Sequence, residues 1–201
     1  MKKDIIDERN EKELSIDFLE IAEFNLFLSL YDLKPAEIRK QVSPEINHIY
    51  WIFGHCITHM DSVFCFECQD FRIFNENELK YFGYGTKKED IMKDEPLTYV
   101  ELIDKFLELS KKTKKYLAEL PAEKFRIPPE KNQSENVVEP LYSSIQRVAL
   151  HIMGHMGQII MIRRLLGNPG KSFVAGIDRE QRRKNFINLE NWWKENKSKY
   201  Q

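Results

Sequence analysis

The chain has 201 residues, of which 42% are hydrophobic and 31% charged, which suits one compact domain with a sizeable core and excludes a disordered chain. Its 31 basic side chains balance 32 acidic ones, and no dense block of lysine and arginine is present, so nucleic acid is not expected as a partner. We expect a single domain spanning residues 1–201.

Targeting and membrane segments are not expected. Residues 1–15 contain no apolar stretch of the kind found in signal peptides, and no later segment approaches the roughly 18 uninterrupted apolar residues that span a bilayer. We therefore expect a soluble, cytoplasmic protein with no membrane partner.

The three cysteines, an odd number without a secretory signal, argue against a disulfide framework. Cys65 and Cys68 form a lone CxxC pair, and no second pair follows. We interpret them, together with Cys56, as small buried apolar side chains rather than as a metal or redox site.

Helical periodicity dominates the sequence, and no alternating strand pattern is convincing, so the fold class is all-α. The first helix is predicted over residues 14–33, because the chain is apolar around much of the helix circumference there and Pro35 follows. The second is predicted from Ser43 and Pro44, a serine cap followed by proline at the first helical position, to about Cys68.

The next segment, about 28 residues long, exceeds an ordinary connection between helices. It either covers a pocket or seals one end of the core with its aromatic side chains, which are Phe71, Phe74, Tyr81, Phe82 and Tyr84. The third helix follows, opened by a capping box at Thr98 and Glu101 and closed before Pro121. Its lysine-rich face is interpreted as solvated surface; the lysines are Lys111, Lys112, Lys114 and Lys115.

The fourth helix is predicted from about residue 140 to 166, where Gly167 can form a C-terminal cap. Its apolar side chains recur in alternating steps of four and three, which is typical of bundle packing, and His155 occupies one of these positions. A last helix is predicted over 178–197, with its two tryptophans packing on the outside of the bundle. The pattern predicts a four-helix bundle with an additional C-terminal helix.

Two histidines, His151 and His155, are separated by four residues on the fourth predicted helix. On a helix they lie about 40° apart and about 6 Å along the axis, so both rings can converge on one ion. A histidine in a core is usually a hydrogen-bonded structural residue, but burying two imidazoles costs free energy unless each ring nitrogen finds a partner. A divalent cation would satisfy both.

A third ligand would come from another helix, and the second predicted helix offers His48, His55 and His59. His48 and His55 would lie about 10 Å apart along the axis, too far to bind one ion. Either His55 and His59 together, or one of the three histidines alone, can therefore join the pair.

Three stretches together resemble the DinB/YfiT family. They are Trp51-Ile52-Phe53-Gly54-His55, the stretch from His151 to His155 followed by Gly157 and Gln158, and the tail RRLLGNPGKSFVAGI. The resemblance implies a four-helix bundle with an extra C-terminal helix and a three-histidine site for a divalent metal.

Carried over residue by residue, the resemblance gives His55, His151 and His155 as the metal ligands. It also implies that Gly157 lets two helices approach closely and that Gln158 packs or bonds behind a ligand. His48 and His59 lie outside the family pattern. His59 completes a four-histidine site, orients a bound water or is simply exposed.

Three neutral imidazoles leave coordination positions open, as in catalytic zinc sites. Imidazole also suits nickel, iron and copper, and we expect zinc or nickel. Ile152 stands where HExxH metalloproteases have their glutamate base, so a protease of that type is disfavoured. Asp61 and Glu67 can serve as a base only if they face inward.

Two hypotheses for the function follow. In the first, the protein is a metal-dependent enzyme acting on a small molecule, either a hydrolase or a transferase that uses a low-molecular-weight thiol. In the second, it is a noncatalytic metal-binding or dimeric interaction module. The apolar width of the first helix, and the habit of the family it resembles, lead us to expect a homodimer.

Overall fold

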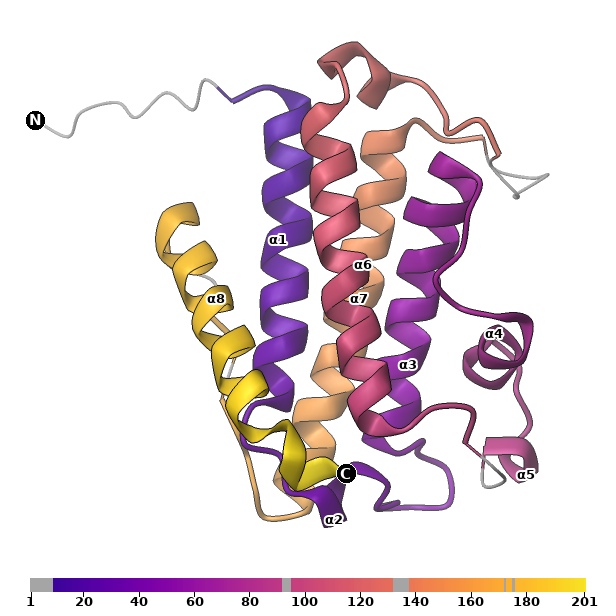
Figure 1. Ribbon diagram of the computed structural model, residues 1–201, viewed down its shortest axis with the longest axis vertical. Helices are drawn as coiled ribbons and strands as arrows, with labels where there is room; N and C mark the ends of the chain where they lie inside the picture. Colours follow the sequence, from indigo (N-terminus) through magenta and orange to yellow (C-terminus); the bar gives the residue numbers. More distant parts are fainter. Residues whose placement is uncertain (1–8, 92–94, 132–137, 172, 175) are drawn as a thin grey trace, which may run out of the picture.

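The computed structural model describes residues 9–91, 95–131, 138–171, 173–174 and 176–201. Four long helices lie side by side in it (Figure 1), and a fifth packs against the first. They are α1 (Glu11–Leu30), α3 (Ile49–Met60), α6 (Tyr99–Glu119), α7 (Leu141–Leu165) and the additional α8 (Arg179–Asn196). The described ranges contain no β-strand, which confirms the all-α prediction.

The four long helices do not simply alternate in direction. In Figure 1, α1 and α7 run from top to bottom, whereas α3 and α6 run from bottom to top. Polar contacts agree with this arrangement: Lys12 near the start of α1 donates to the carbonyl of Ala118 near the end of α6 (2.7 Å), and His59 near the end of α3 lies 3.3 Å from Arg147 near the start of α7. As a result, α3 and α7 are antiparallel neighbours.

The boundaries of α1 differ from the predicted 14–33. The side chain of Asn10 accepts from the backbone of Glu13 in a capping box, so the helix begins about one turn earlier than expected. It ends at Leu30, because Asp32 adopts a left-handed conformation with φ of 57°. Pro35 then opens a separate short helix, α2 (Pro35–Ile38).

The start predicted for the second helix is wrong. Ser43 begins only a turn, closed by the backbone bond from Ile46 to Ser43 (3.1 Å), and α3 begins at Ile49. The cap of α3 is His48, whose Nδ1 accepts from the backbone N–H of Trp51 (3.1 Å). After Met60 the same rod continues as a π-helix, η1 (Asp61–Glu67).

The long segment after η1 contains two short helices, α4 (Glu76–Phe82) and α5 (Lys88–Ile91). Phe82 is completely buried and Tyr81 nearly so, whereas Tyr84 is 99% exposed. Most aromatic side chains of this segment therefore seal the core, which is one of the two expected roles. Tyr84 lies at the surface instead.

The ends of α6 and α7 agree with the predictions. Thr98 and Glu101 form the capping box of α6, and the short 3-10 helix η2 (Ala122–Arg126) follows. Gly167 adopts φ of 79° after α7, so that its N–H and that of the next residue bond back to the last turn. Glycine takes this left-handed conformation without the strain that a Cβ would bring.

The C-terminal helix is held more deeply than expected. Asp178 caps α8 by accepting from Gln181 (2.8 Å), and η3 (Lys197–Tyr200) ends the chain. Trp193 is 1% exposed and donates from Nε1 to Asp104 on α6 (2.9 Å), so this tryptophan is buried where α8 packs on the bundle. The indole is buried because it finds an acceptor there.

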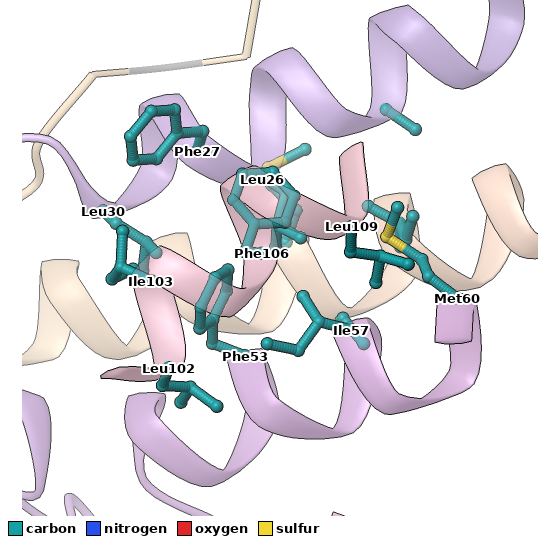
Figure 2. Close-up of a cluster of buried hydrophobic side chains, with 14 of the residues drawn as sticks. Leu26, Phe27, Leu30, Phe53, Ile57, Met60, Leu102, Ile103, Phe106 and Leu109 are labelled. Atoms are coloured by element: carbon teal, nitrogen blue, oxygen red, sulfur yellow. The ribbon is translucent and has the colours of Figure 1, made fainter. Parts of the chain in front are cut away.

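Side chains from three helices interlock at the centre of the bundle (Figure 2). The ring of Phe106 on α6 lies 5.6 Å from that of Phe27 on α1 and 5.5 Å from that of Phe53 on α3, in edge-to-face arrangements. Such contacts stabilise the fold beyond the burial of apolar area.

None of the described helices is both long and apolar enough to cross a bilayer.

The close approach expected at Gly157 is found at Gly54 instead. A Cβ at Gly54 would lie 2.1 Å from the ring of Phe82, whereas a Cβ at Gly157 would meet nothing within 4 Å. The missing side chain of Gly54 therefore creates the space in which α4 packs its last aromatic ring on α3.

We expect Gly54→Ala to lower the free energy of unfolding by about 2 kcal/mol, because the added methyl group overlaps a buried ring. Chemical denaturation of the metal-free protein measures this change. Gly176→Ala is the control, because a Cβ there would meet nothing within 4 Å, and it is expected to be neutral or to stabilise by up to about 1 kcal/mol. Equal effects of the two substitutions would contradict the assignment of the close contact to Gly54.

Candidate metal centre

Three histidines from two helices meet at one point. The Nε2 atom of His151 lies 3.2 Å from that of His55 on α3 and 3.1 Å from that of His155 one turn along α7. One ligand atom from each of the three rings lies within 4.8 Å of the others. Within the described residues, no other histidine, cysteine or carboxylate side chain belongs to such a group.

The second nitrogens of two rings are held by oxygen acceptors. Nδ1 of His55 lies 2.7 Å from the carbonyl oxygen of Phe82, and Nδ1 of His155 lies 2.8 Å from Oε1 of Gln158. Oxygens of these groups only accept, so both Nδ1 atoms carry the proton. In the neutral rings, the Nε2 atoms of His55 and His155 therefore present lone pairs to the centre.

Hydrogen bonding inside the cluster cannot satisfy all three rings. His151 could donate one Nε2 proton, but two lone pairs compete for it, and its buried Nδ1 has no hydrogen-bond partner among the described residues. A cation at the centre would accept all three lone pairs at once, and outer acceptors of this kind are what metal-bound imidazoles have. The cluster is therefore compatible with a divalent-metal site.

Burial keeps the rings of His55 and His151 in the neutral form that binds metal. It lowers the pKa of His55, and it lowers the pKa of His151 to about 3, an effect increased by the neighbouring His59 and His155 rings. Metal binding requires neutral imidazole, so protons compete weakly at neutral pH.

His59 lies beside the cluster without belonging to it. Its ring centroid is 4.4 Å from that of His151, but its Nε2 lies 3.3 Å from Nη1 of Arg147. A guanidinium only donates, so Nε2 of His59 accepts and its proton resides on Nδ1. Burial and the charge of Arg147 lower the pKa of His59 to about 4, which keeps the ring neutral.

His48 has a structural position away from the cluster. It caps α3 by accepting from the backbone N–H of Trp51 and does not belong to the histidine cluster. Its ring is 3% exposed and packs 6.0 Å from Tyr50. This histidine stabilises the start of the helix that carries the first ligand candidate.

The acidic side chains considered as bases are engaged elsewhere or lie outside the cluster. Asp61 is fully buried, accepts from the backbone of Ile73 (2.8 Å) and faces Arg72 (3.5 Å). Glu67 lies further along η1, where burial raises its pKa. The cysteines are free; Cys56 and Cys65 are buried, and burial raises the pKa of the half-buried Cys68 to about 12. None of the three is a thiolate at neutral pH.

Two partners of the cluster were missed by sequence reasoning. Arg147 stands four residues before His151, so the spacing alone could have placed it on the same helix face. The carbonyl of Phe82 carries no sequence signal, because it is a backbone group brought to His55 by the packing of α4.

Trp51 belongs to the motif on which the family resemblance was based. Its ring stacks on that of His55, with centroids 5.0 Å apart and an interplanar angle of 7°.

Comparison with known protein families gives a match. The sequence profile of the DinB superfamily matches residues 21–159, a range that contains all three clustered histidines. Among curated proteins and solved structures, nothing matches the chain.

His151 and His48 are expected to respond oppositely to substitution by leucine. His151→Leu should raise the unfolding free energy of the metal-free protein by about 1 kcal/mol, because it removes a buried nitrogen that has no partner. His48→Leu should lower it by about 1 kcal/mol, because it removes a helix cap. Denaturation in the presence of a chelator measures both, and destabilisation by His151→Leu equal to that by His48→Leu would refute the distinction.

Proposed function

The chain belongs to the DinB superfamily, and on this membership and its histidine cluster we propose that the protein is a metal-dependent enzyme acting on a small molecule. His55, His151 and His155 would hold a divalent cation, zinc or nickel. The observation that carries the proposal is that the Nε2 atoms of the three rings converge. In two of the rings, Nδ1 already donates to an acceptor, so Nε2 has the lone pair that a metal ion needs.

The ligand set favours catalysis over a purely structural ion. Three neutral imidazoles leave coordination positions free, and structural zinc sites usually have four protein ligands. An ion in such a site supplies Lewis-acid activation of water or of a thiol. The residues of this chain would orient the reactants around it.

A cavity beside His55 supports a small-molecule substrate. It has a volume of about 230 Å³ and is lined by residues of α3, η1, α4 and the segments that follow η1 and α4, including His59, Arg72 and Tyr84. At the roughly 30 Å³ that a water molecule occupies in the liquid, this volume corresponds to about eight non-hydrogen atoms. The size suits a compact organic molecule rather than a polymer.

Two reaction types suit a site without a protein base. Within the described residues, no carboxylate joins the three histidines, so the nucleophile would be activated by the ion itself. Hydrolysis by activated water and transfer to an activated low-molecular-weight thiol both meet this condition. The second function, a noncatalytic metal-binding module, predicts instead an ion with no exchangeable ligand.

Metal titration tests the proposal. Calorimetry with zinc or nickel should show about one ion bound per chain. His55→Ala, His151→Ala and His155→Ala should each weaken binding by more than the roughly 10- to 100-fold typical for loss of an outer hydrogen-bond partner, and Gln158→Leu should fall within that range. Stacking of Trp51 on His55 provides a fluorescence signal for the same titration.

His59→Ala is the control for this titration, because its Nε2 already accepts from Arg147 and the ring is not expected to bind the ion. Retention of wild-type affinity in His55→Ala would refute the site. Adding glutathione to the nickel-loaded protein then distinguishes the reaction types, since a thiolate-to-nickel absorption band supports thiol transfer and an unchanged spectrum supports hydrolysis. An ion that exchanges neither water nor thiol supports the noncatalytic module.

We also propose that the protein is a homodimer, paired through α1 and α7. Large apolar side chains are exposed along these two helices, namely Leu14, Phe18, Leu150, Met161 and Leu165. On α7 they continue through Gly154 and Gly157, where a Cβ would meet nothing within 4 Å. Exposed apolar faces of this kind mark contact sites, and glycines allow a second backbone to approach closely.

Light scattering at micromolar concentration should give about twice the chain mass of 24.0 kDa. Leu150→Glu combined with Met161→Glu should give the monomer, because buried carboxylates would face each other across a two-fold interface. Ile127→Glu, an equally apolar exposed position outside α1 and α7, is the control and should leave the dimer intact. A wild-type mass of one chain would refute the dimer.

A further inference from the structure

A groove separate from the histidine cluster runs between α6 and α8, with α1 as its floor. Its volume of about 950 Å³ lies within the range of known small-molecule sites. The lining residues of α6 extend from Leu107 to Ala118, which corresponds to about 16 Å of helix axis. Figure 1 shows the arrangement, with α1 between α8 and α6. The groove is therefore long enough for an extended ligand.

The middle of the groove is apolar. Phe24 of α1, Leu107 of α6 and Phe186 of α8 line it together with Ile187, which is 54% exposed. Phe186 contacts the central core through Phe106, at 6.4 Å between ring centroids. A ligand in contact with these side chains would bury apolar surface that now faces solvent.

Positive charge gathers at one end of the groove. Seven of the lining side chains are basic and three are acidic, although the whole chain has a formal charge of -1. Arg179, Arg182 and Arg183 come from the first turns of α8, whose N-terminus adds a partial positive charge, and Lys115 stands opposite them on α6. An anionic group is therefore favoured at this end.

The acidic side chains at that end do not use all of its donors. Glu20 accepts from Arg183 (2.7 Å) and faces Arg179 (3.5 Å), while Arg182 pairs with Asp17. Arg183 nevertheless remains 53% exposed and Lys115 76% exposed, so both are accessible to a ligand.

A buried donor without a partner lies at the same end. Arg182 lines the groove and is only 3% exposed, yet its Nε has no hydrogen-bond partner among the described residues. An unpaired buried donor is costly, and a bound carboxylate that accepts from it would offset the cost.

Side chains of α6 and α8 meet in the groove. Nζ of Lys114 on α6 lies 4.0 Å from the ring centroid of Phe186 on α8, so a ligand lies over this contact rather than between the two side chains. A single hydrocarbon chain can follow the roughly 16 Å of groove along α6 while its head group reaches the basic end.

We propose that this groove binds a single-chain amphiphile with an anionic head group, a fatty acid. The carboxylate lies at the end formed by Arg183 and Lys115, where the exposed charge of the two side chains favours an anion although Arg183 also binds Glu20. The hydrocarbon chain lies along Phe186 and Ile187. The proposal does not depend on the metal centre, because none of the clustered histidines lines the groove.

Calorimetry with laurate below its micelle concentration tests the proposal. A chelator is present, so that the carboxylate cannot report on a bound metal ion. Laurate should bind saturably, and dodecyltrimethylammonium, which has the same tail length and the opposite charge, should bind at least about tenfold more weakly. Equal binding of the two amphiphiles, or no saturable binding of laurate, would overturn the proposal.

Two exposed variants locate the ligand. Arg183→Glu with Lys115→Glu should weaken laurate binding by at least about tenfold, and so should Ile187→Asp. The matched controls are Arg164→Glu with Lys124→Glu, and Ile127→Asp, all exposed positions outside the groove. Equal losses in variants and controls would overturn the assignment. Displacement of laurate by an acidic amphipathic helical peptide would overturn the proposal and favour a peptide ligand instead.

Discussion

The contact between Gly54 and Phe82 is the constraint on which the histidine cluster depends. Because residue 54 has no side chain, the ring of Phe82 packs against the backbone of α3. This packing brings the carbonyl of Phe82 to Nδ1 of His55, and the resulting bond leaves the Nε2 lone pair facing α7. A packing contact outside the cluster therefore determines which nitrogen of the ring is offered to a cation.

The three histidines replace apolar packing between α3 and α7 with polar atoms that can bind an ion. Leucine at the three positions would fill the space between α3 and α7 without leaving polar atoms unpaired, as His151 Nδ1 is now. The surrounding fold tolerates this because the centre of the bundle, around Phe106, is built from apolar side chains of other turns of the helices. The loss of stability from unpaired polar atoms is therefore confined to one layer of the bundle. Functional sites are where such a loss is expected.

Local signals predicted much of the fold, and tertiary contacts account for the rest. The capping box at Thr98 and the glycine at 167 are complete within a few residues, so α6 and the end of α7 were predicted correctly. Ser43 carries an equally good local signal but starts no helix; His48 caps α3 instead, a role seldom taken by histidine. Spacing alone paired His151 with His155, whereas the choice of His55 came from the family resemblance.

The core also separates the two sites argued for. The groove borders α1, α6 and α8, and the histidines lie between α3 and α7; the rings of Phe186, Phe106 and Phe53 connect the two sides of the bundle. Coupling between distant sites requires an element with two discrete arrangements. The rings that lie between the two sites have one arrangement in this structure, so they provide no two-state element by which a ligand in the groove would change ion binding at the histidines.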